Sequence, residues 1–176
     1  MATFQSNASN SALPESPTTE PAKLYQEGLI AGVIGAATIA VWFLIIDALN
    51  GRPLYTPTVL GTALFRGGAG LAAPETLLID PELVFMFTWV HGLVFCVLGG
   101  IASRLLGVAE HNPNIGFGIV LFFVVFEFGF VAVNLLFAEA VLRALAWQAV
   151  LVGNLLAAAA MAGYFWQRHP NLTIGP

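Results

Sequence analysis

The amino-acid sequence predicts an all-α fold, an integral membrane bundle of four antiparallel helices. Of the 176 residues, 9 % are charged and 58 % are hydrophobic, whereas soluble proteins carry roughly 25 % charged residues. A soluble domain of this length could not bury so much apolar surface. Four apolar stretches each reach the roughly 20 residues that a helix needs to cross a bilayer. Lipid is therefore the expected solvent for most of the chain.

The first segment, residues 1–24, is predicted to be a disordered tail. It is rich in Ser, Thr, Asn and Pro and contains too few large apolar residues to bury a core. It also lacks the basic region and apolar core of a secretory signal. Residues 25–170 are predicted to form a single four-helix transmembrane domain.

The predicted spans are bounded by residues that start or stop helices. The first span ends at Asn50-Gly51 before Pro53, and the second starts with Asp80 as cap and Pro81 at the first helical position. A short connection makes the third and fourth spans antiparallel neighbours. The expected ranges are about 28–50, 81–104, 113–137 and 141–167.

A short helix is predicted inside the long connection between the first two spans, at about residues 57–66. Thr56 and Pro57 form the expected cap and first turn, apolar residues recur at helical spacing, and Gly67-Gly68 ends the run. This segment is too short to span a bilayer. It is expected to lie at the membrane interface or to fold over the mouth of the bundle.

Small residues recur at four-residue intervals in three of the spans. Such residues let helix backbones approach closely in lipid, so they predict the contact faces inside the bundle, with contacts between copies as the alternative. The residues are Gly32, Ala36 and Ala40, then Cys96 and Gly100, then Ala149, Gly153 and Ala157. Cys96 is the only cysteine, which excludes an internal disulfide.

Polar side chains within the spans are concentrated in the half of the bilayer nearest the long connection. Each costs free energy in hydrocarbon and therefore calls for a partner or a function. At about 1.5 Å per residue, His91 is expected roughly 12 Å deep, Asn154 roughly 15 Å and Glu127 roughly 16 Å. The whole set is Asp47, His91, Glu127, Asn134, Gln148 and Asn154.

Two interpretations of this polar set remain open. In the first, His91 and Glu127 bind or relay a proton, a metal ion or a small polar ligand, and Asn154 orients them. The expected entrance is lined by Asp47, Asn134, Gln148 and Thr88. In the second, the chain is a structural accessory subunit of a larger membrane complex, and its polar residues only fix the register of the helices. Burial raises the pKa of a carboxyl and lowers the pKa of an imidazole, whereas pairing of the two groups does the reverse. The protonation states of His91 and Glu127 therefore stay open.

Several function classes are disfavoured by the sequence. Six Lys and Arg in total give no basic stripe for nucleic acid. No complete catalytic set is recognisable, which argues against an enzyme. A haem held by two histidines needs a second intramembrane histidine beside His91. His91 and Glu127 fall short of the three or four ligands that a zinc or copper centre requires. The identity of any cofactor stays open.

The positive charges give no clear orientation. Lys23, Arg104 and Arg168 are expected on the side of the termini, whereas Arg52, Arg66 and Arg143 are expected on the other, a tie of three to three. The absence of an export signal favours both termini in the cytoplasm, in a membrane of the bacterial inner or plasma type. The expected partners are the lipid bilayer and either other membrane subunits or a second copy of the chain.

Overall fold

The computed structural model of the protein describes residues 19–111 and 145–169, and within these ranges every regular element is helical. The elements are α1 (Thr19–Leu49), α2 (Tyr55–Phe65), the 3₁₀ helix η1 (Pro74–Thr76), α3 (Pro81–His111) and α6 (Trp147–Arg168). Three of these helices are long and apolar enough to cross a membrane, over Ala22–Leu49, Pro81–Ala109 and Trp147–Arg168. The predicted span 113–137 lies outside the described residues.

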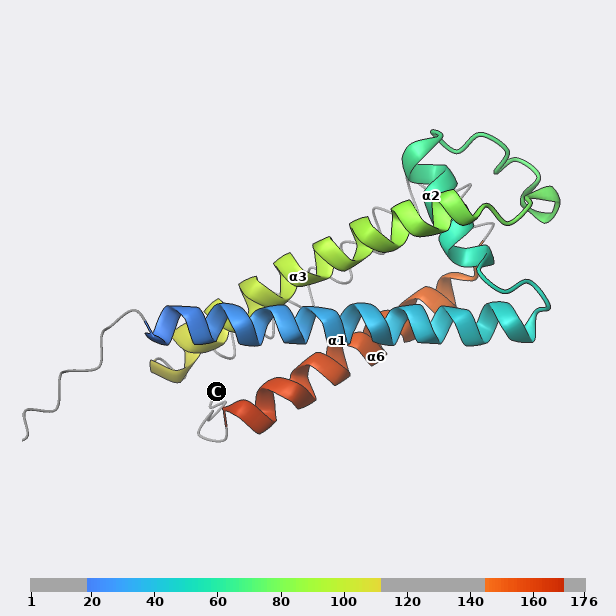
Figure 1. Ribbon diagram of the computed structural model, residues 1–176. Coiled ribbons are helices and arrows are strands. Elements are labelled where there is room, and N and C mark those ends of the chain that lie inside the picture. Colours follow the sequence, from blue (N-terminus) through green and yellow to red (C-terminus); the bar gives the residue numbers. More distant parts are fainter. Residues whose placement is uncertain (1–18, 112–144, 170–176) are drawn as a thin grey trace, which may run out of the picture.

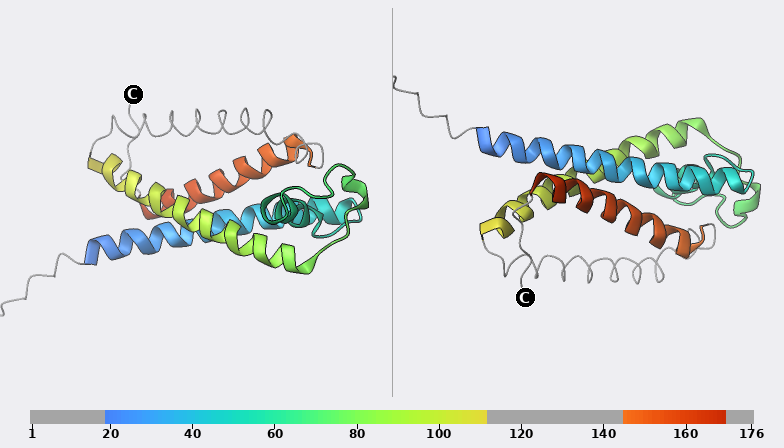
Figure 2. Two further views of the ribbon diagram at one scale, coloured as in Figure 1. Left: turned by 90° about the horizontal axis from the view of Figure 1, so that it is seen from above. Right: turned by 90° about the horizontal axis from the view of Figure 1, so that it is seen from below.

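Helix α1 is the centre of the described arrangement, because both α3 and α6 pack against it. Figure 1 shows α3 crossing α1 close to the start of α1 and diverging from it toward the other end, where α2 lies. Helix α6 crosses α1 on a different side, as the views in Figure 2 also show. The three helices long and apolar enough to span a membrane are thus inclined to one another rather than parallel.

Helix boundaries differ from the expected ones at three places. Helix α1 begins at Thr19, so residues 19–24 are helical rather than part of the tail. Helix α3 continues to His111, beyond the expected end at 104, because a helix need not stop where the hydrocarbon does. Helix α6 begins only at Trp147, not at 141, because Ala146 has an extended backbone (ψ 114°). That extension lets Leu145 pack against α2.

Backbone contact joins α1 to α3. A Cβ atom added to Gly28 would lie 2.6 Å from the Cα atom of Gly100, and one added to Gly32 would lie 2.7 Å from the Cα atom of Cys96. Real Cβ atoms essentially never approach other heavy atoms so closely, so only glycine fits at these two positions. The small-residue spacing correctly predicted this contact between the first two spans.

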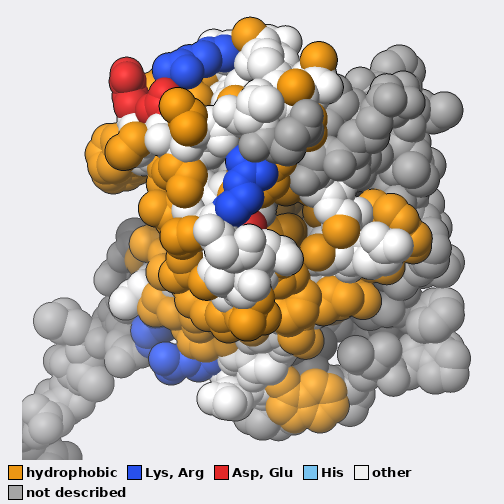
Figure 3. Space-filling view, turned by 90° about the vertical axis from the view of Figure 1, so that its right-hand side faces the viewer, with side chains coloured by type: hydrophobic (Ala, Val, Ile, Leu, Met, Phe, Trp, Pro, Cys, Tyr) orange, Lys and Arg blue, Asp and Glu red, His pale blue; other side chains and the backbone are white. Residues whose placement is uncertain are grey.

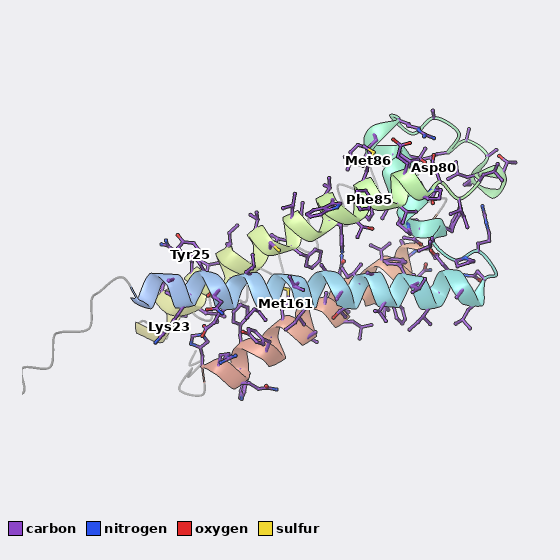
Figure 4. The ribbon with its side chains drawn as sticks, viewed as in Figure 1. Lys23, Tyr25, Asp80, Phe85, Met86 and Met161 are labelled. Atoms are coloured by element: carbon purple, nitrogen blue, oxygen red, sulfur yellow. The ribbon has the colours of Figure 1, made fainter. Side chains whose placement is uncertain are left out.

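The contact between α1 and α6 is built on a tryptophan. The Trp42 ring covers Gly153, where an added Cβ would lie 2.9 Å from the indole Cδ1. Its Nε1–H donates a hydrogen bond of 2.8 Å to the carbonyl oxygen of Ala149. One face of α6 is therefore fixed against α1, with Ala157 buried on the same face and Met161 between the two helices farther along (Figure 4).

The end of α1 has the expected Asn-Gly stop. Gly51 has a left-handed φ of +70°, which favours glycine. Its N–H donates to the carbonyl of Ala48 (3.0 Å), and the N–H of Arg52 donates to the carbonyl of Asp47 (2.9 Å). This pair of bonds is the Schellman arrangement, which satisfies the last carbonyls of a helix and turns the chain sharply.

Helix α2 presents a buried face rich in threonine. The hydroxyls of Thr58 and Thr62 donate to the carbonyls of Leu54 (2.9 Å) and Thr58 (2.7 Å), so burial leaves neither hydroxyl without a partner. Gly61 lies against Leu83 at the start of α3. The side chain of Val59 packs with Leu71 and Leu145 in a small apolar cluster.

Residues 50–80 form a cap segment at this end of the molecule. Two arginines connect its earlier part to its last residues. The Arg52 guanidinium donates to the carbonyls of Leu77 (2.9 Å) and Pro74 (3.4 Å) and stacks over the Tyr55 ring at 3.9 Å. Arg66 forms an ion pair of 2.8 Å with Asp80, the N-cap of α3. Figure 3, which views this end of the molecule, shows mostly hydrophobic side chains with a few charged groups among them.

Candidate intramembrane polar site

The structure describes five of the seven side chains that the sequence assigns to a site, namely Asp47, Thr88, His91, Gln148 and Asn154. Glu127 and Asn134 lie outside the described residues. The predicted pairing of His91 with Glu127 therefore stays a prediction.

His91 projects from α3 toward α1. Its Nε2 atom lies 3.4 Å from the backbone carbonyl oxygen of Ala36. The imidazole ring is flanked by Phe87, one turn before it, at a centroid distance of 5.6 Å, and by Phe95, one turn after it, at 4.8 Å. These aromatic contacts hold a half-buried imidazole against the neighbouring helix.

The contact with Ala36 favours one tautomer of the His91 ring. A carbonyl oxygen can only accept, so this contact is a hydrogen bond in the tautomer that carries hydrogen on Nε2, and in that neutral ring Nδ1 keeps its lone pair. Within the described residues no hydrogen bond reaches Nδ1. A histidine anchored through one nitrogen to a carbonyl is prepared to accept a proton or bind a ligand through the other.

His91 lies at the middle of the spanning part of α1. Ala36, its contact, is halfway along the span Ala22–Leu49. The middle of a span is the level at which a polar group is farthest from water on both sides, and thus the most costly to leave without a purpose. The structure thus places His91 against the middle of the α1 span, and its depth in a bilayer stays a prediction.

Asn154 lies closer to the cap segment than His91 does. Its neighbour Gly153 contacts Trp42, which is six residues farther along α1 than Ala36. At about 1.5 Å per residue this places the two levels about 9 Å apart. The estimates from the sequence differ because they assumed parallel helices with a common starting level. A direct bond between Asn154 and His91 does not fit this separation.

Asp47 has a structural contact at the corner between α1 and α2. Its carboxylate is only 3 % exposed and accepts two hydrogen bonds of 2.7 Å, one from the backbone N–H and one from the hydroxyl of Thr56. Thr56 is the second residue of α2, whereas Leu54 at the N-cap position makes no side-chain cap bond. The expectation that Thr56 caps this helix is wrong. The cap oxygen comes from α1, and its negative charge also suits a helix N-terminus.

The two other described residues of the expected entrance are exposed. The Thr88 hydroxyl donates to the carbonyl of Val84 at 2.7 Å, and Gln148 occupies the first turn of α6. Within the described residues, no hydrogen bond joins either side chain to His91. Among the described site residues, the structure thus places His91 between α1 and α3 and the four others nearer the cap segment.

Polar contacts at the opposite end were not expected from the sequence. The Ser103 hydroxyl donates 2.7 Å to the carbonyl of Leu24, and His169 pairs with Glu27 at 3.2 Å. The only sequence signal was the position of Ser103 four residues after Gly99 on the small-residue face of α3. Residues 19–111 and 145–169 contain no group of three or more His, Cys, Asp or Glu placed to hold a metal ion.

No family model, no curated protein and no solved structure matches the chain. Function is therefore inferred from the placement and chemistry of its own side chains.

Proposed function

We propose that the chain is a four-span membrane protein whose interior holds a polar site around His91, which binds or relays a proton, a metal ion or a small polar ligand. The observation that supports this is the state of the imidazole. It projects from α3 against the middle of α1, and its Nε2 lies 3.4 Å from the carbonyl oxygen of Ala36. With Nε2 as the donor in this contact, Nδ1 keeps a lone pair.

A proton is the least demanding occupant of such a site, because a single lone pair is enough to bind it. A metal ion would need further ligands, and Glu127 is the proposed second group in either case. Asn154 would act through a bridging molecule, given its different level along α1. Asn134 and Gln148 are proposed for the polar route from the cap segment to the site.

The second candidate function is an accessory subunit of a larger membrane complex. It is favoured by the way the other described polar groups are used. The carboxylate of Asp47 and the hydroxyls of Thr88 and Ser103 all bond within the chain itself. Polar contacts of this kind orient helices and need no ligand, at an average of about 0.6 kcal/mol each.

Thermal unfolding of the purified protein in detergent, measured from pH 5 to pH 8 with and without Zn²⁺ or Cu²⁺, distinguishes these functions. The informative variants are His91→Phe, which keeps an aromatic ring between Phe87 and Phe95 but removes both nitrogens, and Glu127→Gln. A ligand that binds the folded state raises the midpoint by mass action. We expect a response to pH or metal in the wild type that both variants lose. His169→Phe removes a histidine outside the spans together with its pairing with Glu27, so it measures the part of the pH response that does not come from the polar site.

If both variants keep every response of the wild type, the polar site is wrong. Stoichiometric protein partners that co-purify with all variants equally would then support the accessory subunit.

A further inference from the structure

An open groove lies on the outer surface where α1 and α3 cross, at the end of the molecule opposite the cap segment. Its volume is about 390 Å³ and its walls are almost entirely apolar. The lining residues are Tyr25, Cys96, Val97, Gly100, Ile101, Arg104 and Leu105. Gly100 leaves the groove open at its position, since a Cβ atom added there would meet nothing within 4 Å.

One charged group stands at the edge of this groove. Arg104 is exposed, donates from Nη2 to the hydroxyl of Tyr25 and holds its guanidinium carbon 4.9 Å from the centre of that ring. Among the described residues no carboxylate pairs with Arg104. A guanidinium has five N–H donors, and Tyr25 uses one side of it, so donors remain for an anion.

The position of the groove relative to the bilayer indicates its occupant. Arg104 belongs to the last turns of the span Pro81–Ala109, whereas Cys96 and Val97 lie about two turns deeper. The charged edge is thus at the headgroup level and the apolar walls extend into the hydrocarbon. Soluble small molecules are usually enclosed over 70–90 % of their surface. An open apolar groove instead suits a chain whose other side already contacts lipid.

We propose that this groove binds one anionic phospholipid, with an acyl chain along Gly100 and Val97 and the phosphate on Arg104. The guanidinium, which no carboxylate among the described residues neutralises, supplies the charge complementarity, and Tyr25 fixes its direction. A phosphate accepts two parallel N–H bonds from arginine, which makes this the preferred side chain for such a headgroup. The site is separate from His91, so it stands or falls independently of the proposed function.

Native mass spectrometry of the full chain tests the site, by titration with phosphatidylglycerol and, in parallel, phosphatidylcholine. Arg104→Gln is expected to weaken phosphatidylglycerol binding about five-fold, since a basic residue near anionic lipid contributes about 1 kcal/mol. Lys23→Gln is the charge-matched control. Lys23 is on the same end of α1 but projects from the side opposite Tyr25 (Figure 4), so its loss should leave the affinity unchanged.

Gly100→Leu tests the apolar half of the groove. The new side chain has room, so the protein should fold, yet it fills the space for the acyl chain and should also weaken binding. Gly163→Leu is the matched control on α6, where an added Cβ likewise meets nothing within 4 Å. Equal affinity of the wild type and both groove variants would overturn the proposal. So would equal binding of the two lipids, competition by inorganic phosphate alone, or a change in oligomeric state with Gly100→Leu at unchanged lipid binding.

Discussion

The two ends of the α1–α3 pair are held together by different means. Near Gly28 and Gly32 the two backbones touch, and no side chain separates them. At the other end the helices diverge, and α2 occupies the space beside them (Figure 1). There the chain is fixed by hydrogen bonds to charged groups, namely Asp47, Arg52 and Arg66.

This difference predicts how strongly substitutions at each end lower the stability of the protein. A backbone contact fails as soon as one methyl group is added, because neither backbone can move aside independently. A contact made by side-chain hydrogen bonds is weakened when an acceptor is removed. The loss of stability then increases with the number of hydrogen bonds that are broken. Substitutions at four positions test these two kinds of contact, in order from the largest expected loss of stability to the smallest.

Gly32→Ala is expected to destabilise the protein most, by about 3 kcal/mol or more, the upper part of the range for overpacking. The added methyl would collide with the backbone at Phe95 and Cys96. Gly92→Ala on α3 is the matched control, because its Cβ would meet nothing within 4 Å. The control should gain up to about 1 kcal/mol from helix propensity. Unfolding free energies measured in detergent would contradict the backbone contact if the two variants changed alike.

Asp47→Ala is expected to cost about 2–3 kcal/mol, because hydrogen bonds to a charged group are worth about 1.5–3 kcal/mol and the N–H of Thr56 would be left buried. Asp47→Asn keeps one acceptor oxygen and should lie between the wild type and Asp47→Ala. Amide hydrogen exchange should also show loss of protection at the start of α2. An unchanged exchange pattern there would mean that this carboxylate does not cap the helix.

Trp42→Phe is expected to cost about 0.6 kcal/mol, the average for an interhelical hydrogen bond in a membrane protein. The change removes the bond to Ala149 but leaves an aromatic ring over Gly153. Trp42→Ala removes the ring as well and should cost several times more. If Trp42→Phe matched Trp42→Ala, the hydrogen bond and not the ring would dominate this contact.

The smallest effect is expected from the titration of Asp80. The backbone N–H of Leu83 and, to a lesser degree, Arg66 hold the pKa of this exposed carboxyl below its ordinary value. A lowered pKa in the folded state contributes stability above the unfolded pKa of about 3.9, and this contribution is lost as the pH falls through the folded value. Thermal midpoints of the wild type and Asp80→Asn should therefore begin to converge near about pH 4 and approach each other further as the pH falls through the lowered pKa of Asp80. Parallel curves over that range would contradict the contribution of Asp80.

Local signals in the sequence predicted much of the fold. The Asn50-Gly51 stop and the Asp80-Pro81 start are where the structure has them, because these signals act within one turn of the chain. The extension of α1 back to Thr19 and of α3 to His111 was missed, since the expected limits followed the charges rather than helix propensity. The late start of α6 depends on Leu145 packing under α2, which no local pattern reveals.

The candidate site was predictable only in part. The apolar run around His91 predicted that this residue lies within a span, but its contact with Ala36 depends on where α3 crosses α1. The bond between Asp47 and Thr56 joins residues nine positions apart across a turn, and the sequence pattern alone gave Thr56 the wrong role. Depths counted along separate helices failed for Asn154 because inclined helices do not share one scale.

Leu145 in the cluster with Val59 and Leu71 has a consequence for movement. A helix that slides along its own axis by one turn moves about 5.4 Å. An axial displacement of α6 by this distance would remove Leu145 from the apolar cluster. It would also break the hydrogen bond between Trp42 and Ala149, which lies one turn after Leu145. The cap segment therefore restrains α6 against sliding along its axis. A rotation or tilt of α6 about a point near Leu145 is the movement that this contact still allows.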